Sequence, residues 1–146
     1  MSGAGDHQHS RMGQSAIRAL LRAAGLRPTR QRVALASILF GNGHRHVCAE
    51  RLYEEAAIQN VSVSLATIYN TLHQFTNAKL LREIAGDRSR AYFDTNTSDH
   101  HHFLLEDTNQ VFDIPEGELV LKRVPSIRPG YEVSRIDVVV RLRPIP

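Results

Sequence analysis

Residues 64–77 read Ser-Leu-Ala-Thr-Ile-Tyr-Asn-Thr-Leu-His-Gln-Phe-Thr-Asn, and this stretch decides the fold. Leu65, Ile68, Leu72 and Phe75 recur three or four residues apart, which predicts a helix with one apolar stripe. Ser64 stands directly before the stripe, where a helix N-cap accepts a hydrogen bond from the backbone. We therefore expect a helix that begins after Ser64 and buries this stripe.

The opposite side of this helix is polar but carries no charge before Lys79. Its residues are Ala66, Thr67, Asn70, His73, Gln74 and Asn77. Neutral donors and acceptors on short side chains are suited to reading base edges in the major groove of DNA. We expect this face to enter that groove, and an ordinary solvated face is the alternative.

The segments around this helix complete a recognisable plan. Apolar residues at helical spacing predict helices over about 15–24, 29–40 and 48–58, with Thr29 as a second N-cap and Gly25 ending the first helix. Two short strands are expected over 80–84 and 91–94, and the turn between them holds Arg88 and Arg90. Helices followed by a hairpin with arginines at its tip predict a winged helix, whose arginines lie near phosphate or the minor groove.

The C-terminal part is predicted as a small α/β unit. Strands are expected over 102–106 and 111–114 and a short helix over 116–122. In a last strand Ile136, Val138, Val140 and Leu142 should face one way and Arg135, Asp137, Arg141 and Arg143 the other. About fifty residues bury little surface alone, so pairing with a second copy is expected.

Together these patterns predict an α+β fold with an N-terminal winged helix-turn-helix domain and a small C-terminal α/β dimerisation domain. Its predicted parts are a disordered tail (1–12), the DNA-binding domain (13–94), a hinge (95–99) and a dimerisation and ligand-sensing domain (100–146).

Charge divides the chain in the same way. Residues 1–92 hold twelve Lys or Arg against six Asp or Glu, whereas residues 93–146 hold six against nine. A basic half joined to an acidic one suggests a module for a polyanion attached to a module with another task. No apolar run is long enough to cross a membrane and no signal-peptide core follows Met1, so a cytoplasmic location is expected. The single cysteine, Cys48, excludes an internal disulfide framework and a four-thiolate zinc site.

Three stretches resemble the ferric uptake regulator superfamily, at the same order and spacing over roughly residues 15 to 142. They are Leu26-Arg27-Pro28-Thr29-Arg30-Gln31-Arg32, His46-Val47-Cys48-Ala49-Glu50-Arg51-Leu52-Tyr53 and Ser64-Leu65-Ala66-Thr67-Ile68-Tyr69-Asn70-Thr71-Leu72. The Tyr69-Asn70 pair and the run His100-His101-His102 are most similar to the iron response regulator subgroup. This resemblance implies a homodimer that binds A/T-rich operator DNA and controls iron and haem genes.

The resemblance also implies roles for individual residues. The recognition helix maps onto Ser64, Thr67, Tyr69 and Asn70, with Tyr69 against a thymine methyl group. Arg27 would reach the minor groove or a phosphate, and Arg30 and Arg32 would add phosphate contacts. Packing of Tyr69 into the core is the alternative for that residue.

The metal ligands of the superfamily fall on His46, Asp94, His100, His102 and Asp113. Imidazole nitrogens and carboxylate oxygens together suit iron, manganese or zinc. Residues two apart on a strand face the same side, so His100 and His102 can hold one ion while His101 points away. An ion held between the two domains would fix the angle between them.

Haem is the competing ligand. The three histidines His100, His101 and His102 beside Phe103 offer axial nitrogen and an apolar neighbour. No cysteine precedes Cys48, so the N-terminal Cys-Pro haem motif of some iron response regulators is absent. Haem and a divalent metal both stay open, and so does a peroxide- or manganese-sensing repressor of the same superfamily.

Two positions depart from the superfamily pattern. Leu105 and Thr108 stand where many relatives carry the cysteines of a structural zinc site, so no structural Cys-type zinc is expected. Ile136 or Arg135 stands where many relatives have a histidine, which makes a full second metal site doubtful.

Two other classes of function were weighed. A His/Asp cluster could hold a hydrolytic metal, but no nucleophile or general base is placed near it by a motif, and no phosphate-binding glycine loop occurs. The chain is therefore not expected to be an enzyme. A module whose basic half binds a protein partner is the other alternative.

Overall fold

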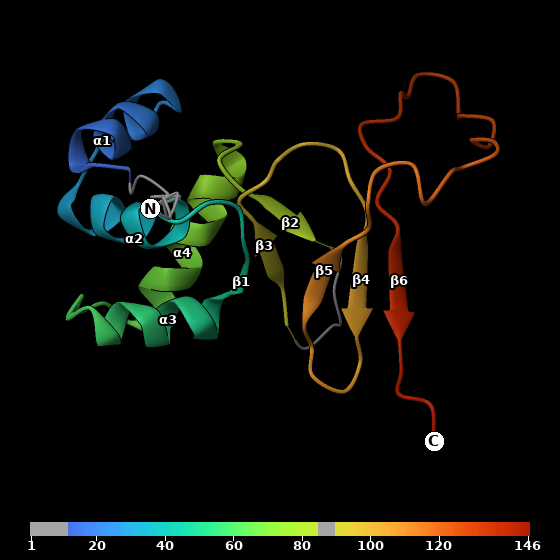
Figure 1. Ribbon diagram of the computed structural model, residues 1–146. Coiled ribbons are helices and arrows are strands. Elements are labelled where there is room, and N and C mark those ends of the chain that lie inside the picture. The colour runs from blue at the N-terminus through green and yellow to red at the C-terminus, as the bar shows by residue number, and fades with distance from the viewer. Residues whose placement is uncertain (1–11, 85–89) are drawn as a thin grey trace, which may run out of the picture.

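The computed structural model describes residues 12–84 and 90–146 and has the expected α+β architecture (Figure 1). The helices are α1 (Gln14–Ala23), α2 (Arg30–Phe40), α3 (Ala49–Ile58) and α4 (Leu65–Asn77). The strands are β1 (His46–Cys48), β2 (Arg82–Ile84), β3 (Tyr92–Asp94), β4 (His102–Leu105), β5 (Val111–Asp113) and β6 (Val139–Leu142). The tail over 1–11 and Arg88 in the wing turn lie outside the described residues.

The helix boundaries follow the capping residues in the sequence. The Thr29 hydroxyl accepts a hydrogen bond from the Arg32 N–H at 3.3 Å, and the Ser64 hydroxyl accepts one from the Thr67 N–H at 3.1 Å. Gly25 follows α1 with a φ of +79°, a conformation that only glycine adopts without strain. The predicted starts of α2 and α4 and the predicted end of α1 are therefore confirmed.

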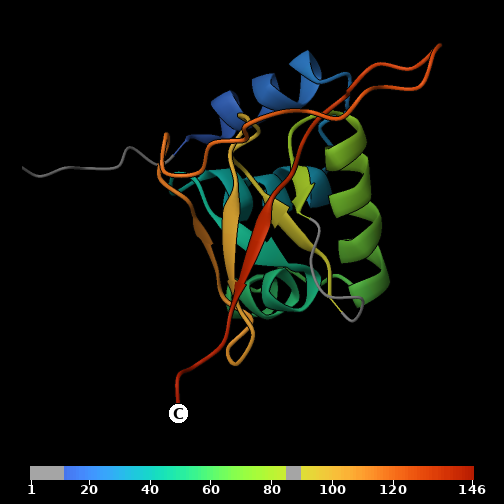
Figure 2. The same cartoon turned by 90° about the vertical axis from the view of Figure 1, so that its right-hand side faces the viewer.

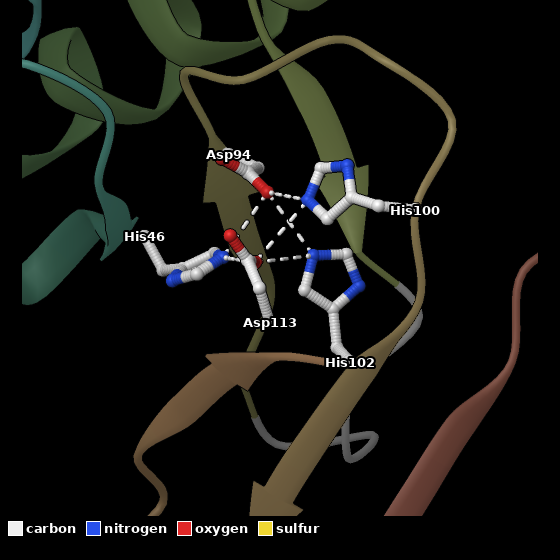
Figure 3. Close-up of side chains that lie close together, drawn as sticks. All are labelled: His46, Asp94, His100, His102 and Asp113. Atoms are coloured by element: carbon white, nitrogen blue, oxygen red, sulfur yellow. Dashed lines mark hydrogen bonds and ion pairs between the residues drawn. The ribbon is translucent and has the colours of Figure 1, made fainter. Parts of the chain in front are cut away.

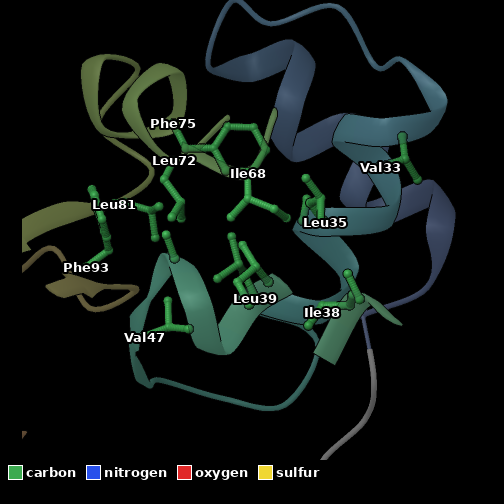
Figure 4. Packing of buried hydrophobic residues seen from close by; sticks show 14 of the residues in the cluster. Val33, Leu35, Ile38, Leu39, Val47, Ile68, Leu72, Phe75, Leu81 and Phe93 are labelled. Carbon is green, nitrogen blue, oxygen red and sulfur yellow. The ribbon is translucent and has the colours of Figure 1, made fainter. Parts of the chain in front are cut away.

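One hydrophobic core joins the four helices to the first sheet (Figure 4). Ile68, Leu72 and Phe75 of α4 are fully buried and pack in one cluster with Leu39 of α2 and Phe93 of β3. The prediction for Leu65 was wrong, since this side chain is 38% exposed. It occupies the first position of α4, where the helix has only begun to approach the core. The inward face of α4 is therefore set by its second and third turns.

The six strands form two three-stranded sheets. The first has the order β1-β3-β2 and is antiparallel; the second has the order β5-β4-β6, in which β4 and β6 run parallel. Figure 2 views the second sheet from the side remote from the helices, so the first sheet lies between the second sheet and the helices. Strand β1, which no sequence pattern predicted, pairs His46 with Asp94.

The segment between β5 and β6 differs from the prediction. Residues 116–122 form a turn rather than the expected helix, and Gly117 has a φ of +85°, which interrupts helical geometry. Val120 and Leu121 are 79% and 45% exposed. A helix this short needs packing against a neighbour to be stable, and its apolar side chains have no such cover in the single chain.

The last strand is shorter than predicted. It begins at Val139, and Val139 packs against a small cluster that contains Ile84 and Leu104. Ile136, Val138 and Val140 are half-buried, as Val139 is, whereas Leu142 is exposed. Before the strand, Asp137 pairs with the buried Arg82 of β2.

Among the described residues, no helix is both long and apolar enough to span a membrane.

Candidate metal centre and nucleic-acid interface

Five side chains converge where the two sheets meet (Figure 3). They are His46, Asp94, His100, His102 and Asp113, and we refer to them as the five-ligand cluster. Each contributes one potential ligand atom, and these atoms all lie within 4.8 Å of one another. Ligands at about 2.1 Å from a shared ion lie no more than roughly 4.2 Å apart, so a divalent cation would require only a small contraction.

The three imidazoles all direct Nε2 at the two carboxylates. Asp94 Oδ2 lies 3.1 Å from His46, 2.7 Å from His100 and 3.0 Å from His102. Asp113 Oδ1 lies 2.8 Å, 3.2 Å and 3.5 Å from the same three nitrogens. The cluster thus offers three nitrogens and two oxygens, a mixed donor set that suits iron, manganese or zinc.

Strand register brings these residues together. His46 is directly opposite Asp94 in the first sheet, and His102 is directly opposite Asp113 in the second. Opposite residues of an antiparallel pair project on the same face. Each sheet therefore presents one histidine and one aspartate to the other sheet, and His100 adds its ring from the segment before β4.

Further contacts orient the ligands from outside the cluster. His100 Nδ1 lies 2.7 Å from the Ser98 carbonyl, and Asp94 Oδ1 accepts a hydrogen bond from the Asn96 N–H at 2.8 Å. A histidine that donates from Nδ1 to a carbonyl keeps the lone pair of Nε2 for a metal. The predicted hinge, 95–99, is thus the segment that supplies these orienting groups.

The cluster is largely enclosed, and His46 and Asp94 shift each other's pKa. The side chains of Asp94 and His102 are only 1% and 2% exposed, whereas that of Asp113 is 47% exposed. Burial raises the pKa of Asp94, but hydrogen bonds from His102 and His46 outweigh it and hold that pKa well below its usual range. Burial lowers the pKa of His46, and the hydrogen bond and charge of Asp94 reverse this, so its pKa is raised. Asp94 is therefore ionised and can bind a cation.

His101 is not part of the cluster. Its Nδ1 accepts a hydrogen bond from the Val138 N–H at 3.1 Å, so the ring is directed at the lead into β6. Alternate residues of extended chain face opposite sides, so His101 points away from His100 and His102. The geometry therefore does not support His101 as a ligand of the same ion. Its contact with Val138 instead helps to align β4 and β6.

The exposed face of α4 has the predicted uncharged character. Ser64, Ala66, Asn70, His73, Gln74 and Asn77 are exposed. Thr67 is half-buried, and its hydroxyl lies 2.9 Å from that of Ser64, so this pair closes the start of the helix. Asn70 is thus the amide on this face that comes nearest the helix start.

Tyr69 is neither fully buried in the core nor without a side-chain contact. Its ring is half-buried against the core, and its hydroxyl donates a hydrogen bond to Glu50 Oε1 at 2.7 Å. Glu50 lies in the first turn of α3. Core packing and surface presentation, the two alternatives for Tyr69, are therefore combined in one side chain.

The predicted arginines differ in how free they are. Arg27, Arg30 and Arg90 are exposed. Arg32 is half-buried and donates hydrogen bonds to the Arg27 carbonyl at 3.0 Å and to Gln74 Oε1 at 3.1 Å. Arg32 thus ties α2 to α4, in addition to any contact with phosphate.

The sequence model of the ferric uptake regulator family matches residues 23–141. The chain belongs to the ferric uptake regulator family. Among curated relatives, the peroxide-responsive repressor PerR of Staphylococcus aureus is 34% identical over 101 residues, which cover 69% of this chain and 68% of the repressor. This family consists of metal-responsive transcriptional regulators.

Solved structures of the family share the fold. The ferric uptake regulator of Pseudomonas aeruginosa with manganese is 29% identical and has a TM-score of 0.67, over 88% of this chain and 97% of that one. The ferric uptake regulator of Vibrio cholerae has a TM-score of 0.69 at 21% identity, over 86% of this chain and 98% of that one. The second likeness shows the fold alone.

Two groups of contacts close to the candidate sites were not predicted. One is Glu50, which holds Tyr69. The other is a buried ion-pair group in which Arg82, 4% exposed, bonds to Asp137, to Asp99 Oδ1 at 3.3 Å and to the Ser98 carbonyl at 2.8 Å. Both depend on contacts between distant segments, and the only local signal was an arginine at an inward position of a predicted strand.

Proposed function

We propose that this chain is a homodimeric transcription regulator that binds A/T-rich operator DNA and is controlled by a divalent cation at the five-ligand cluster. The observation that carries the proposal is the origin of the ligands. His46 and Asp94 belong to the sheet that packs on the recognition helix, whereas His102 and Asp113 belong to the second sheet. One ion would therefore join the two parts of the fold.

The cluster residues explain how such control would work. Two carboxylates at the interface repel each other unless a proton or a cation lies between them. A bound cation supplies that positive charge. His46 and Asp94 would then be held against His102 and Asp113, which fixes the angle between the sheets and hence the position of α4.

The proposed DNA contacts divide into base readers and phosphate contacts. Ser64, Thr67, Tyr69 and Asn70 lie at the start of α4 and are assigned to the major groove. The arginines are assigned to phosphate or the minor groove: Arg27, Arg30, Arg32, Arg88 and Arg90. An uncharged helix face flanked by arginines supports this assignment.

A second copy is assigned to the C-terminal part. We assign residues 13–94 to DNA binding, 95–99 to the hinge and 100–146 to dimerisation. Apolar side chains gather in the exposed segment between β5 and β6: Val120, Leu121, Val124, Ile127, Tyr131 and Val133. Such a concentration of exposed apolar groups is typical of a surface that another protein covers.

The proposed signal is iron, bound as a bare divalent cation rather than as haem. His100 and His102 direct Nε2 at Asp94 inside the cluster, so a haem iron at either ring would first have to displace this carboxylate. A bare cation can bind the histidine nitrogens and the Asp94 carboxylate together, so nothing has to be displaced. It is therefore the better supported ligand. Peroxide or manganese sensing is the second candidate, favoured by the name of the Staphylococcus relatives and by the manganese in the Pseudomonas structure.

Operator binding tests the proposal directly. Fluorescence anisotropy on an A/T-rich inverted repeat, with metal-free protein, should show affinity rising by about tenfold or more when Mn²⁺ or anaerobic Fe²⁺ is added. His102→Ala should abolish the response, whereas His101→Ala, its matched control on the other side of the strand, should retain it. An affinity that ignores both cations and the His102 change would refute the metal assignment.

The same samples separate the candidate signals. A Soret band shift on haem addition that is lost when His100 and His102 are replaced would transfer the role to haem. Loss of DNA binding when the Fe²⁺ form meets peroxide, with the Mn²⁺ form unaffected, would favour the peroxide sensor.

A further inference from the structure

The hydrogen bond between Tyr69 and Glu50 joins the two helices of the helix-turn-helix. Tyr69 lies in the second turn of α4, and Glu50 lies in the first turn of α3, nineteen residues earlier. The donor–acceptor distance is 2.7 Å, which is typical of a charge-assisted O–H···O bond. The contact thus connects a candidate base-reading side chain to a fixed point on the neighbouring helix.

Glu50 is built as an anionic acceptor. Its position in the first turn of α3 places the carboxylate near the positive end of the helix dipole. The hydrogen bond from Tyr69 is the largest influence on the pKa of Glu50 and, with a backbone N–H, lowers that pKa despite partial burial. Glu50 is therefore ionised at neutral pH, when it binds the phenol most strongly.

The carboxylate is also withdrawn from the surface. Glu50 Oε2 is buried, and among the described residues no group donates a hydrogen bond to it. A carboxylate that faced DNA would be repelled by phosphate, and an unpaired buried oxygen carries a free-energy cost. The fold tolerates that cost while the second oxygen, Oε1, holds the tyrosine. This arrangement suits a residue that acts through Tyr69 rather than one that touches DNA.

The ring of Tyr69 has little freedom left. One side packs on the core that contains Ile68 and Leu72, and the hydroxyl is fixed by Glu50. A side chain whose ring and hydroxyl are both restrained loses little rotamer entropy when DNA binds. The restraint is thus in place before the operator arrives.

We propose that Glu50 is a positioning residue for operator recognition: its carboxylate holds the Tyr69 ring in the orientation that meets DNA. The inference rests on the proposed function, since it requires Tyr69 to lie at the operator. It adds a residue on α3, outside the recognition helix, that determines how the helix reads its site.

A double-mutant cycle on the full-length, metal-loaded protein tests this inference. Operator affinity is measured for the wild type, Glu50→Ala, Tyr69→Phe and the double variant. Each single change should weaken binding by about tenfold, because the ring is retained but its restraint is lost. The double variant should be no weaker than either single one. If the two losses multiply, the hydroxyl and the carboxylate act separately and the inference is overturned.

Three further measurements exclude a purely structural role. Glu50→Gln keeps an acceptor oxygen at the same reach and should recover most of the affinity. Glu54→Gln removes the same charge from an exposed position of α3 and should leave operator affinity within about twofold. In the free protein, the pKa of Tyr69 should be raised in the wild type and fall toward its ordinary value in Glu50→Ala, which removes the largest cause of the shift. An unchanged Tyr69 pKa in Glu50→Ala would count against the inference.

Failure of the inference differs from failure of the proposed function. If the wild type binds the operator and the cycle is multiplicative, only the inference fails. If the wild type does not bind duplex DNA at low ionic strength, the proposed function fails and the role of Glu50 fails with it.

Discussion

Arg82 and Asp94 lie directly opposite each other on β2 and β3, and both side chains reach from the first sheet to the chain beyond residue 95. Asp94 bonds to His100 and His102 in the five-ligand cluster. Arg82 bonds to Asp137 in the lead into β6, and Arg135 contributes a second bond to Asp137 at 2.7 Å. The two parts of the fold are therefore joined by the five-ligand cluster and, beside it, by a separate ion-pair contact.

The ion-pair contact should contribute measurably to stability. Asp137→Asn keeps an amide oxygen beside the buried Arg82 but removes the opposite charge, and we expect it to lower the free energy of unfolding by about 2–3 kcal/mol. Urea unfolding of the metal-free protein measures this. Asp107→Asn, at an exposed position of the β4–β5 turn, is the control and should change it by less than about 0.5 kcal/mol. Equal effects of the two changes would show that the pair contributes nothing.

The contribution of Asp137 should depend on pH in a defined direction. Burial raises the pKa of Asp137, but hydrogen bonds from Arg82 and Arg135 outweigh it, so the pKa lies below the ordinary value of 3.8. The folded protein therefore binds this proton less tightly than the unfolded chain does. The stabilisation is present above the ordinary value and is lost as pH falls through the folded value. The difference in unfolding free energy between the wild type and Asp137→Asn should be constant from about pH 7 to 5 and shrink below about pH 4. A difference that grew in acid would contradict the assignment.

Packing on α4 makes the second and third turns of this helix critical. Leu72→Ala removes a fully buried side chain from the shared core and should cost about 3 kcal/mol of unfolding free energy. Leu65→Ala is the matched change at the exposed start of the same helix and should cost less than about 1 kcal/mol. Chemical denaturation of both variants checks this. Similar losses would mean that Leu65 is buried in solution.

Much of the N-terminal fold could be predicted because its signals are local. The stripe of Ile68, Leu72 and Phe75 and the caps Thr29 and Ser64 lie within single elements, so spacing alone predicts helices close to α1–α4. The shared side of His100 and His102 follows from the two-residue spacing of extended chain, although His100 lies just before β4. The wider ligand set required the resemblance to a family, since His46 and Asp113 are 67 residues apart.

The parts that were wrong or missed depend on contacts between distant segments. The last strand is shorter than its alternating pattern predicts, and the residue before it that pairs with the buried Arg82, Asp137, lies 55 positions from that arginine. Strand β1 is only three residues long and exists because His46, Val47 and Cys48 pair with β3. Residues 116–122 have helical spacing but no surface to pack against in the single chain. Propensity is a weak guide where such tertiary contacts decide the structure.

A bound cation should stabilise the folded chain, and the buried ligand Asp94 should matter more for this than the half-exposed ligand Asp113. Saturation with Mn²⁺ at about one hundred times its Kd should add about 2.7 kcal/mol to the free energy of unfolding, and chelation should remove it. Asp94→Asn should abolish this gain, because Asp94 Oδ2 is within 3.1 Å of all three imidazoles. Asp113→Asn, at a half-exposed ligand, should weaken Mn²⁺ binding by roughly tenfold while some stabilisation survives. Thermal unfolding with and without chelator distinguishes the two. Equal responses would show that the ion binds elsewhere.

Phosphate contacts and base contacts should separate when operator affinity is measured against salt. Arg27→Ala should weaken binding to all sequences alike and reduce the slope of log affinity against log salt by about 1, because one phosphate contact and its released counterion are lost. Asn70→Ala should leave that slope unchanged but lower the preference for the operator over a site with one altered base pair, by about 1–3 kcal/mol. Arg143→Ala, an exposed arginine beyond β6, should alter neither quantity. If Asn70→Ala changed the salt slope and Arg27→Ala changed the base preference, the roles would be exchanged and α4 could not lie in the groove with its neutral face toward the bases.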